Sequence, residues 1–191
     1  MLILEIISIF LLSCLALFCL WYFLDALSCK EDIITNKDTT KKIIKFININ
    51  FPQENIFYDL GSSMGSFALD LAEKCPQLQI TGIDNSLLRI LISKLRAFLQ
   101  NKKIIFLKKD IFETDLLKAN LIYVFIPLIL LPKLAIKLER ELSRKAVVIT
   151  SVSNPVNFTG WELVEVIPKN PKNKNERDIF IYKFPFRKIV G

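Results

Sequence analysis

Apolar and polar positions divide this chain into one long uncharged run and a series of shorter alternating segments. The run covers Ile6 to Leu24, 19 residues that are bracketed by Glu5 and Asp25. After residue 40, short apolar runs alternate with segments in which apolar residues recur every three or four positions. Alternation of apolar runs with helical spacing predicts strands and helices in turn, and therefore βαβ units in a mostly parallel sheet.

The apolar runs and the helical spacing also give the expected bounds of each strand and helix. Strands are expected at 55–60, 78–83, 103–107, 121–126 and 146–150, and helices at 66–74, 86–100 and 131–142. An earlier helix would be capped by Asn36 or Asp38 and would bury Ile43, Ile44 and Ile47. The helix at 86–100 is amphipathic, and its apolar residues at helical spacing are Leu87, Leu88, Leu91, Leu95, Phe98 and Leu99.

The end of the chain follows a different pattern. Trp161–Ile167 and Asp178–Phe184 are strand-like runs joined by a polar loop, which predicts an antiparallel hairpin. The loop, Pro168–Arg177, carries four basic residues against Glu176, a composition that suits anionic lipid, an acidic partner or plain solvent. We therefore predict an α/β fold with a Rossmann-like, doubly wound, seven-stranded sheet and an antiparallel C-terminal hairpin, preceded by one transmembrane helix.

The long uncharged run has the length of a membrane span. At 1.5 Å per residue, 19 helical residues extend over roughly 28 Å, close to the hydrocarbon thickness of a bilayer. Trp21, Tyr22 and Phe23 gather at one end, where aromatic rings favour the headgroup level. The first basic residue is Lys30 and more lysines follow, so the positive-inside tendency places the C-terminal side in the cytoplasm. We predict a single-pass membrane anchor through residues 6–24, with the globular part on the cytoplasmic side.

Three other interpretations fit the run less well. A cleaved signal peptide needs basic residues before the apolar stretch, and Glu5 stands there instead. Leu12-Ser13-Cys14 suggests a lipoprotein, but the apolar stretch continues for ten residues past the cysteine. A buried core helix of this length would carry a polar face. The predicted organisation is an anchor at 1–28, a linker at 29–40 and one globular domain at 41–191.

Charge and residue types narrow the chemistry of the globular part. After residue 29 the chain has 26 basic and 17 acidic residues, a formal charge of +9 that would attract anionic headgroups or nucleic acid alike. The chain has no histidine, which excludes Ser-His and Cys-His nucleophile pairs and histidine-based metal sites. Three of the four cysteines lie in or beside the apolar run and no CxxC spacing occurs, so neither a disulfide framework nor a metal site is expected.

Three acidic motifs follow three successive predicted strands. In the first, Asp59-Leu60-Gly61-Ser62-Ser63-Met64-Gly65, small residues lead from a strand into a helix and allow a ligand to approach the backbone. The acid two residues before Gly61 and the spacing of the glycines both depart from the GxGxxG pattern of dinucleotide-binding loops. A glycine turn after a first strand is common in α/β folds, so this motif indicates a ligand site only together with the two motifs that follow.

The second motif is Gly82-Ile83-Asp84-Asn85-Ser86, in which a carboxylate can accept both ribose hydroxyls of a nucleoside. A helix cap is the alternative role, but Asn85 or Ser86 could cap unaided, which leaves Asp84 for a ligand. The third motif is Lys109-Asp110-Ile111-Phe112, where Asp110 could bind the exocyclic amine of adenine and an apolar neighbour could pack on the ring. An ordinary acidic turn fits the third motif equally well. All three motifs end strands at the edge where open α/β sheets bind ligands.

These motifs resemble the class I, seven-strand, S-adenosylmethionine-dependent methyltransferases. More narrowly, the chain is similar to archaeal broad-specificity protein lysine methyltransferases and to the mitochondrial lysine methyltransferases of the adenine nucleotide translocase and the ATP synthase c subunit. The resemblance runs from about Thr35 to Phe184 and rests on FYDLGSSMGSF, GIDNSLLRI, KKDIFETDLLKANLIYVFIPL, FTGWELVEVI and IFIYKF. It implies that residues 41–191 form a methyltransferase domain with S-adenosyl-L-methionine as its cofactor.

The resemblance also implies roles for single residues. Asp59 and Gly61 would hold the methionine moiety, Asp84 the ribose, and Asp110 with Ile111 the adenine. The predicted cofactor-binding set also includes Ser63, Gly65 and Asn85. Three positions depart from the family's DLGxGDGR motif: Ser63 replaces the second glycine, Met64 an acidic residue and Ser66 an arginine. A serine is tolerated at that turn if its φ is negative, and the departures predict reduced or lost affinity for the cofactor.

The segment Tyr123–Pro127 would receive the methyl acceptor. It lacks the Asn/Asp-Pro-Pro-Tyr/Phe motif of many nucleic-acid and glutamine methyltransferases, which disfavours a base or an amide as acceptor. A lysine must shed its proton before it is methylated, and a desolvated pocket encourages this without any histidine. Pro127 and the rings of Tyr123 and Phe125 are the pocket candidates. We expect the two rings to point to opposite faces of the sheet and at least one of them to pack in the core. No residue is assigned as catalytic.

The predicted function is therefore a membrane-anchored protein lysine N-methyltransferase whose partner is a protein with an accessible lysine. A lipid or small-molecule N-methyltransferase at the membrane is one alternative, because an anchor also places the pocket near headgroups. An inactive cofactor-binding or interaction module is the other, because of Ser63 and Met64. A nucleic-acid partner is disfavoured, since no recognition motif accompanies the basic charge.

Overall fold

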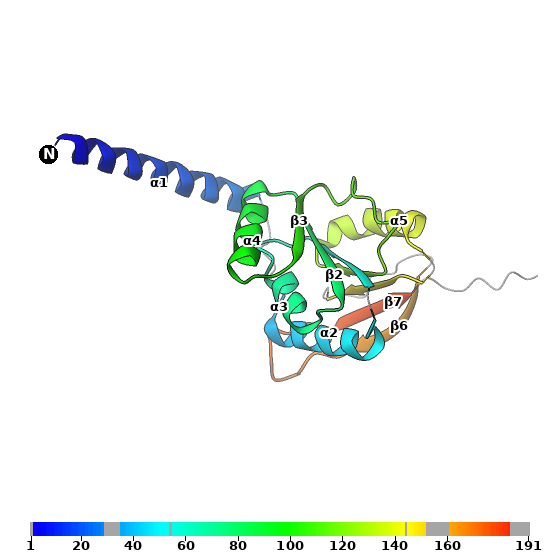
Figure 1. Cartoon of the computed structure of the whole chain (residues 1–191). Helices are drawn as coiled ribbons and strands as arrows, with labels where there is room; N and C mark the ends of the chain where they lie inside the picture. Colours follow the sequence, from blue (N-terminus) through cyan, green and yellow to red (C-terminus); the bar gives the residue numbers. More distant parts are fainter. Residues whose placement is uncertain (1, 29–34, 54, 144, 152–160, 184–191) are drawn as a thin grey trace, which may run out of the picture. The chain divides into compact units, whose positions relative to one another are not determined.

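The computed structural model consists of two compact units, Met1–Asp32 and Ile33–Gly191. The first contains one helix, and the second contains a sheet with its covering helices (Figure 1). Side chains in the first helix are described from Ile3 to Tyr22. The residues that the structure describes are 2–28, 35–53, 55–143, 145–151 and 161–183.

The first unit is formed by α1, Leu2–Ser28, a continuous helix of 27 residues. Its described apolar side chains are exposed all around the helix. The Ser13 hydroxyl donates to the Ile9 carbonyl at 2.8 Å, so this polar group is satisfied inside the helix itself. The segment Ile3–Tyr22 is long and apolar enough to cross a bilayer, a property that signal sequences and buried core helices can share. The predicted apolar helix is confirmed, and its place in a membrane stays a prediction.

The second unit is built on one seven-stranded sheet in the order β3-β2-β1-β4-β5-β7-β6. Strands β1 to β5 are parallel, while β7 is antiparallel to both of its neighbours. The predicted C-terminal hairpin is therefore confirmed, and β7 is inserted between β5 and β6. The strands are β1 Asn55–Leu60, β2 Leu78–Asp84, β3 Ile104–Lys108, β4 Leu121–Val124, β5 Val147–Thr150, β6 Glu162–Ile167 and β7 Ile179–Lys183.

Helices cover both faces of this sheet (Figure 1). On one face, α2, α3 and α4 bury a core with the inward side chains of the strands. On the other face, α5 packs with the segment 111–119 over a second core. The bounds are α2 Lys37–Asn50, α3 Ser66–Lys74, α4 Leu87–Leu99, the short 3-10 helix η1 Leu128–Leu130, and α5 Leu131–Glu141. The elements predicted from residue 55 onward agree with these bounds within two residues.

Helix α2 begins as its sequence predicts. The Asn36 side chain accepts a hydrogen bond from the Asp38 N–H at 2.8 Å, which satisfies one of the free donors at the helix start. Ile43 and Ile47 are fully buried, and Ile44 is partly buried. These contacts fix α2 against the sheet.

Helix α4 lies where it is predicted, but its buried side differs from the expected one. The helix buries Ile90, Ser93 and Ala97 and exposes most of its leucines. The reason is close packing, because a Cβ placed on Gly65 would lie 3.1 Å from the Cβ of Ser93. Only small side chains fit this contact, so the leucine-rich side of the helix faces outward.

Candidate functional site

The three acidic motifs meet at one edge of the sheet. β1 pairs with β2 and β4 in parallel, and β3 pairs with β2, so their carboxyl ends lie side by side. The chain passes from β3 and β2 on one side of β1 to β4 on the other, and such a switch in strand order is where open α/β sheets bind ligands. The Lys109 N–H donates to the Asp84 carbonyl at 3.0 Å, which ties the third motif to the second.

The turn from β1 to α3 is a tight left-handed loop, residues 61–65, called here the glycine loop. Gly61 has φ +84° and Gly65 has φ +74°, values at which side chains are strained. A Cβ on Gly61 would lie 2.9 Å from the Phe125 carbonyl oxygen, so the loop also packs directly against the end of β4. The N–H groups of Gly61 and Ser62 both donate to the Ile83 carbonyl at 2.9 Å. The loop is thus fastened to both neighbouring strands.

Ser63 also has a positive φ, at +48°. The condition under which a serine is readily tolerated, a negative φ, is therefore not met. Its backbone is held from both sides: the N–H donates to Asp84 Oδ2 at 2.9 Å, and the carbonyl lies 3.0 Å from the Ser93 hydroxyl. These contacts hold the serine in a conformation that costs on the order of 1 kcal/mol for a residue with a Cβ.

Asp59 is the most unusual ionisable group of the site. It is 2% exposed, and its Oδ2 has no hydrogen-bond partner among the residues that the structure describes. Burial, and then the charge of Asp84, raise the pKa of Asp59 to about 8. An acid in this condition is one that a cation could convert to its ionised form. The same region holds the Ser62 hydroxyl, which is also buried without a partner in the described part of the chain.

Asp84 takes part of the helix-cap role that its sequence allows, and it also binds the glycine loop, which the sequence does not predict. Its Oδ2 accepts from the Ser63 N–H and its Oδ1 from the Ser86 N–H, both at 2.9 Å. Ser86 caps α4 as predicted, but Asp84 is not simply left over for a ligand, because it organises both turns. Each carboxylate oxygen accepts more than one hydrogen bond, so ribose hydroxyls can still be bound. Asn85, next to it, is exposed.

Asp110 forms a compact turn at the start of the segment after β3. Its Oδ1 accepts from the Phe112 N–H at 2.8 Å, and its carbonyl accepts from the Thr114 hydroxyl at 2.8 Å. Asp110 is exposed, whereas Ile111 and Phe112 are partly buried against the second core. The turn presents a carboxylate beside apolar side chains, an arrangement compatible with a purine ring.

The aromatic residues at the end of β4 are arranged differently from the expectation. Tyr123 and Phe125 lie on the same face, with ring centroids 6.0 Å apart in a stacked arrangement. The expected opposite orientation is wrong, because side chains two residues apart on a strand share a face. Tyr123 also lies 4.4 Å from Phe67 and belongs to the core, while Phe125 is partly buried and Pro127 is exposed.

The Tyr123 hydroxyl joins two segments that the sequence analysis did not connect. It lies 2.6 Å from Ser151 Oγ at the end of β5 and 3.1 Å from Thr35 Oγ1, just before α2. Burial raises the pKa of Tyr123 above its usual range, so the hydroxyl is neutral and can both donate and accept. No local pattern marks Thr35 or Ser151 as neighbours, because 88 and 28 residues separate them from Tyr123.

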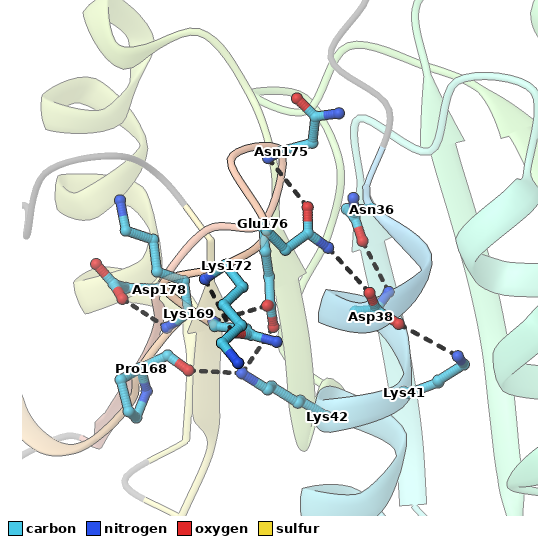
Figure 2. Close-up of polar contacts among 12 residues, drawn as sticks. Asn36, Asp38, Lys41, Lys42, Pro168, Lys169, Lys172, Asn175, Glu176 and Asp178 are labelled. Carbon is cyan, nitrogen blue, oxygen red and sulfur yellow. Dashed lines mark hydrogen bonds and ion pairs between the residues drawn. The ribbon is translucent and has the colours of Figure 1, made fainter.

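The β6–β7 loop lies against α2 (Figure 2). The Lys42 ammonium pairs with the buried Glu176 carboxylate at 2.7 Å and donates to the Pro168 carbonyl at 2.6 Å. Asn173 donates to Asp38 at 2.9 Å. The next residue after Glu176 is Arg177, whose guanidinium carbon lies 5.2 Å from the centre of the Phe125 ring. At least this basic residue therefore faces the site.

Helix α4 supports the glycine loop with two polar side chains that the sequence analysis did not single out. The Ser93 hydroxyl lies within hydrogen-bond distance of the Ser63 carbonyl, and Arg96 donates to the Met64 carbonyl at 2.6 Å and to Ser66 Oγ at 2.9 Å. A serine and an alanine four residues apart in an otherwise bulky helix were the available signal for this close approach. Among the described residues, no group of three or more Cys, Asp or Glu side chains could hold a metal ion.

Comparisons with known proteins identify the fold. No protein-family model and no curated protein sequence matches the chain. An RNA methyltransferase from Salinibacter ruber, solved with S-adenosyl-L-homocysteine, superposes with a TM-score of 0.68 over 83% of this chain and 98% of its own, at 16% identity. A precorrin-6y C5,15-methyltransferase from Geobacter metallireducens GS-15 gives 0.62 over 81% and 92%, at 12% identity.

A third structure extends the range of substrates among these neighbours. The ribosomal protein L11 methylase from Lactobacillus delbrueckii subsp. bulgaricus gives a TM-score of 0.60 over 79% of this chain and 80% of its own, at 16% identity. The three proteins are named for an RNA, a small molecule and a protein, and at these identities they share architecture with this chain. The chain has the Rossmann-like α/β fold of the class I methyltransferases.

Proposed function

We propose that this chain is a membrane-anchored, S-adenosylmethionine-dependent methyltransferase and that it methylates lysine on a membrane-associated protein. The observation that carries the proposal is the buried Asp59 carboxyl, which has an unpartnered oxygen beside the glycine loop. A buried acid without a partner is costly unless a ligand completes it. The amino group of S-adenosylmethionine is a cation of the kind that would do so.

The residues of the edge fit the remaining parts of this cofactor. Asp59 and the glycine loop, from Gly61 to Gly65, would hold the methionine moiety, and Asp84 with Asn85 the ribose. Asp110 and Ile111 would hold the adenine. When bound, the cofactor supplies an electrophilic methyl group. The chain's own contribution would be to orient the reacting groups and to exclude water, which is the main requirement of an in-line displacement.

The end of β4 fits an amine acceptor. Phe125 presents a partly buried aromatic surface, and Arg177 places a positive charge 5.2 Å from its ring. Desolvation and a neighbouring cation both favour the neutral form of a lysine amine, which is the form that attacks a methyl group. No imidazole is needed for this, consistent with a chain that has no histidine.

The apolar helix α1 would hold the enzyme at the membrane. Residues 6–24 would span the bilayer, and the lysines that begin at Lys30 would keep the catalytic domain on the cytoplasmic side. A tethered domain reaches only acceptors close to the membrane, which favours lysines of membrane-associated proteins. The domain boundaries that accompany this proposal are an anchor at 1–28, a linker at 29–40 and a methyltransferase domain at 41–191, although α2 already begins at Lys37, inside the expected linker.

Two observations keep alternative functions in view. Ser63, at φ +48°, narrows the space for the methionine moiety, and Met64 removes a polar contact to it. Both changes favour an inactive cofactor-binding or interaction module. The apolar anchor favours a lipid or small-molecule N-methyltransferase at the membrane, since headgroup amines lie within the same reach. Either alternative makes a different prediction for the experiment below.

The first test is binding of S-adenosylmethionine to the full chain in detergent micelles, measured by calorimetry. We expect micromolar binding that falls by about tenfold or more in Asp59→Asn, because a hydrogen bond to a charged group is worth about 1.5–3 kcal/mol. Asp70→Asn is the matched control, since Asp70 is exposed on α3 and outside the site. Absence of binding by the wild-type chain would support the inactive module and contradict the enzyme.

The second test identifies the acceptor. The full chain is incubated with radiolabelled S-adenosylmethionine and either native membranes or protein-free vesicles, and the products are hydrolysed and separated. Methyl-lysine in the protein fraction is the expected result. Label that enters the vesicle lipids and not the proteins would support a lipid acceptor and overturn the lysine proposal.

A further inference from the structure

Helix α4 carries a stripe of large apolar side chains on its outer side. Leu95 is 58% exposed, Phe98 81% and Leu99 72%, and Leu87 and Leu91 are about half exposed. Positions 87, 91, 95 and 98 are spaced by four, four and three residues, so they lie on one side of the helix. These five residues are called here the α4 stripe.

The stripe cannot turn inward within this fold. The opposite side of α4 is fully occupied by Ile90, Ser93 and Ala97, which are buried against the sheet and the glycine loop. Arg96 anchors the rotation of the helix through its hydrogen bonds to the Met64 carbonyl and to Ser66. A rotation that buried the leucines would break these bonds and place bulky side chains where only small ones fit. The apolar stripe is therefore a fixed outer surface of the unit.

The stretch of sequence that carries the stripe has charges of a single sign, although Lys102 lies 3.8 Å from Glu73 of α3. From Asn85 to Lys109 the sequence contains no acidic residue and seven basic ones: Arg89, Lys94, Arg96, Lys102, Lys103, Lys108 and Lys109. Lys94 is exposed on α4 beside the stripe, and Lys103, Lys108 and Lys109 are exposed around β3. A helix with an apolar outer side and basic flanks is the pattern of helices that lie in the interface of an anionic bilayer.

Other occupants fit this surface less well. A second copy that used the same face would bring two segments of uniform positive charge against each other, which costs energy in a two-fold interface. A nucleic acid would be drawn to the lysines, but its phosphates would then meet Leu91, Leu95 and Phe98. An anionic bilayer accommodates both the apolar side chains and the lysines, because the apolar side chains enter the acyl region while the lysines stay among the anionic headgroups.

The covalent link to the anchor makes this contact geometrically accessible. Six residues, 29–34, separate the end of α1 from Thr35, so the chain between them extends over at most about 25 Å. If α1 lies in a bilayer, this short segment keeps the globular unit at its surface. The inference therefore rests on the membrane anchoring contained in the proposed function, and it is independent of the cofactor and of the methyl acceptor.

We propose that the α4 stripe docks on the anionic bilayer surface and gives the globular unit a second membrane contact beyond the anchor. Leu91, Leu95 and Phe98 lie at the boundary between headgroups and acyl chains, and Lys94 lies among the headgroups. Because α4 also holds the glycine loop through Ser93 and Arg96, this contact fixes how the site is presented to acceptors at the membrane.

The test uses the full chain in nanodiscs of phosphatidylcholine and phosphatidylglycerol that hold one copy each. Phe98→Cys is labelled with an environment-sensitive fluorophore after Cys14, Cys19 and Cys29 are replaced by alanine, while Cys75 is buried and stays. Ile49→Cys is the matched control, because Ile49 is a large apolar residue on α2 that is 66% exposed. We expect a blue-shifted emission at position 98 and several-fold stronger quenching by lipids brominated in their acyl chains.

A separate preparation reports on the anchor alone. There the native Cys14 is labelled after Cys19 and Cys29 are replaced, and the same brominated lipids are used. Quenching at Cys14 together with equal, weak quenching at positions 98 and 49 would overturn the docking of α4 and leave the anchor intact. No quenching at Cys14 would overturn the anchor and the docking with it. A blue-shifted emission at position 98 that appears only when a disc holds two copies would assign the stripe to a contact with a second copy and overturn the bilayer contact.

Discussion

Replacing Asp59 by asparagine is expected to stabilise the fold while it weakens cofactor binding. The side chain keeps its shape but can no longer ionise. The pKa of Asp59 is raised from the ordinary 3.8 to about 8, first by burial and then by Asp84. At pH 7 the unfolded chain is ionised at this position, so folding must take up a proton there. Each pKa unit is worth about 1.4 kcal/mol, which makes the cost of keeping Asp59 at pH 7 up to about 4 kcal/mol.

The sign of the pH dependence follows from the direction of this shift. A folded carboxyl whose pKa is raised contributes most favourably below the pKa of the unfolded chain, and this contribution is lost as the pH rises through the folded value. The advantage of Asp59→Asn should therefore be small near pH 4, grow by at most about 1.4 kcal/mol per pH unit, and level off above about pH 8. Part of the gain is offset because the buried amide also needs partners, so on the order of 2 kcal/mol is expected at pH 7.

The assay is urea unfolding of the full chain in detergent micelles, followed by circular dichroism at several pH values from 4 to 9. Asp70→Asn again serves as the matched control, because it removes the same charge at an exposed position of α3. A variant that is less stable than the wild type at pH 7.5, or a stability difference that does not change with pH, would refute the assignment of a buried, neutral Asp59.

The remaining predictions concern the same edge of the sheet. Affinity for S-adenosylmethionine should rise as the pH increases from 6 to 7.5, by at most about tenfold per pH unit, because the cofactor's cation pairs with ionised Asp59. Calorimetric titrations in buffers of different ionisation enthalpy should detect the proton that Asp59 releases. Asp59→Asn should abolish both the pH dependence and the proton release. Ser63→Gly should raise stability by about 1 kcal/mol in thermal unfolding, since glycine adopts φ +48° without strain; a loss of stability would contradict a positive φ there. Arg96→Met should keep the helical circular dichroism signal but weaken cofactor binding, because the Met64 carbonyl and Ser66 lose their donor. Unchanged affinity would show that the glycine loop keeps its conformation without Arg96. Tyr123→Phe should lower the free energy of unfolding by about 1–2 kcal/mol in urea titrations, because the hydroxyls of Ser151 and Thr35 lose a buried partner; an equally stable variant would contradict these contacts.

The layered architecture and the location of the candidate site follow from local sequence patterns. Short continuous apolar runs indicate buried strands, and apolar residues at every third or fourth position indicate helices that bury one side. Parallel strands joined by helices must all end at the same edge, so acids placed after Asn55–Leu60, Leu78–Asp84 and Ile104–Lys108 had to come together. The apolar helix was equally plain, since nothing but length and the absence of charge defines it.

The tertiary structure alone decided which way each side chain faces and which backbone conformations are strained. Helical spacing finds the stripe from Leu87 to Leu99, but it does not say whether that stripe meets the core or the surroundings; the choice was made by Ser93 and Ala97 against the glycine loop. The φ of Ser63 is likewise set by its hydrogen bonds to distant residues.

The same distinction explains the two remaining differences between expectation and structure. Asp84 organises two turns because the N–H groups of Ser63 and Ser86 both reach it, and the first of these comes from another strand end. Tyr123 becomes a core residue because Phe67, Ser151 and Thr35 converge on it from three other segments. Local sequence fixes period and propensity, whereas contacts between distant segments depend on packing of the whole sheet, and only the folded chain brings those groups within hydrogen-bond distance.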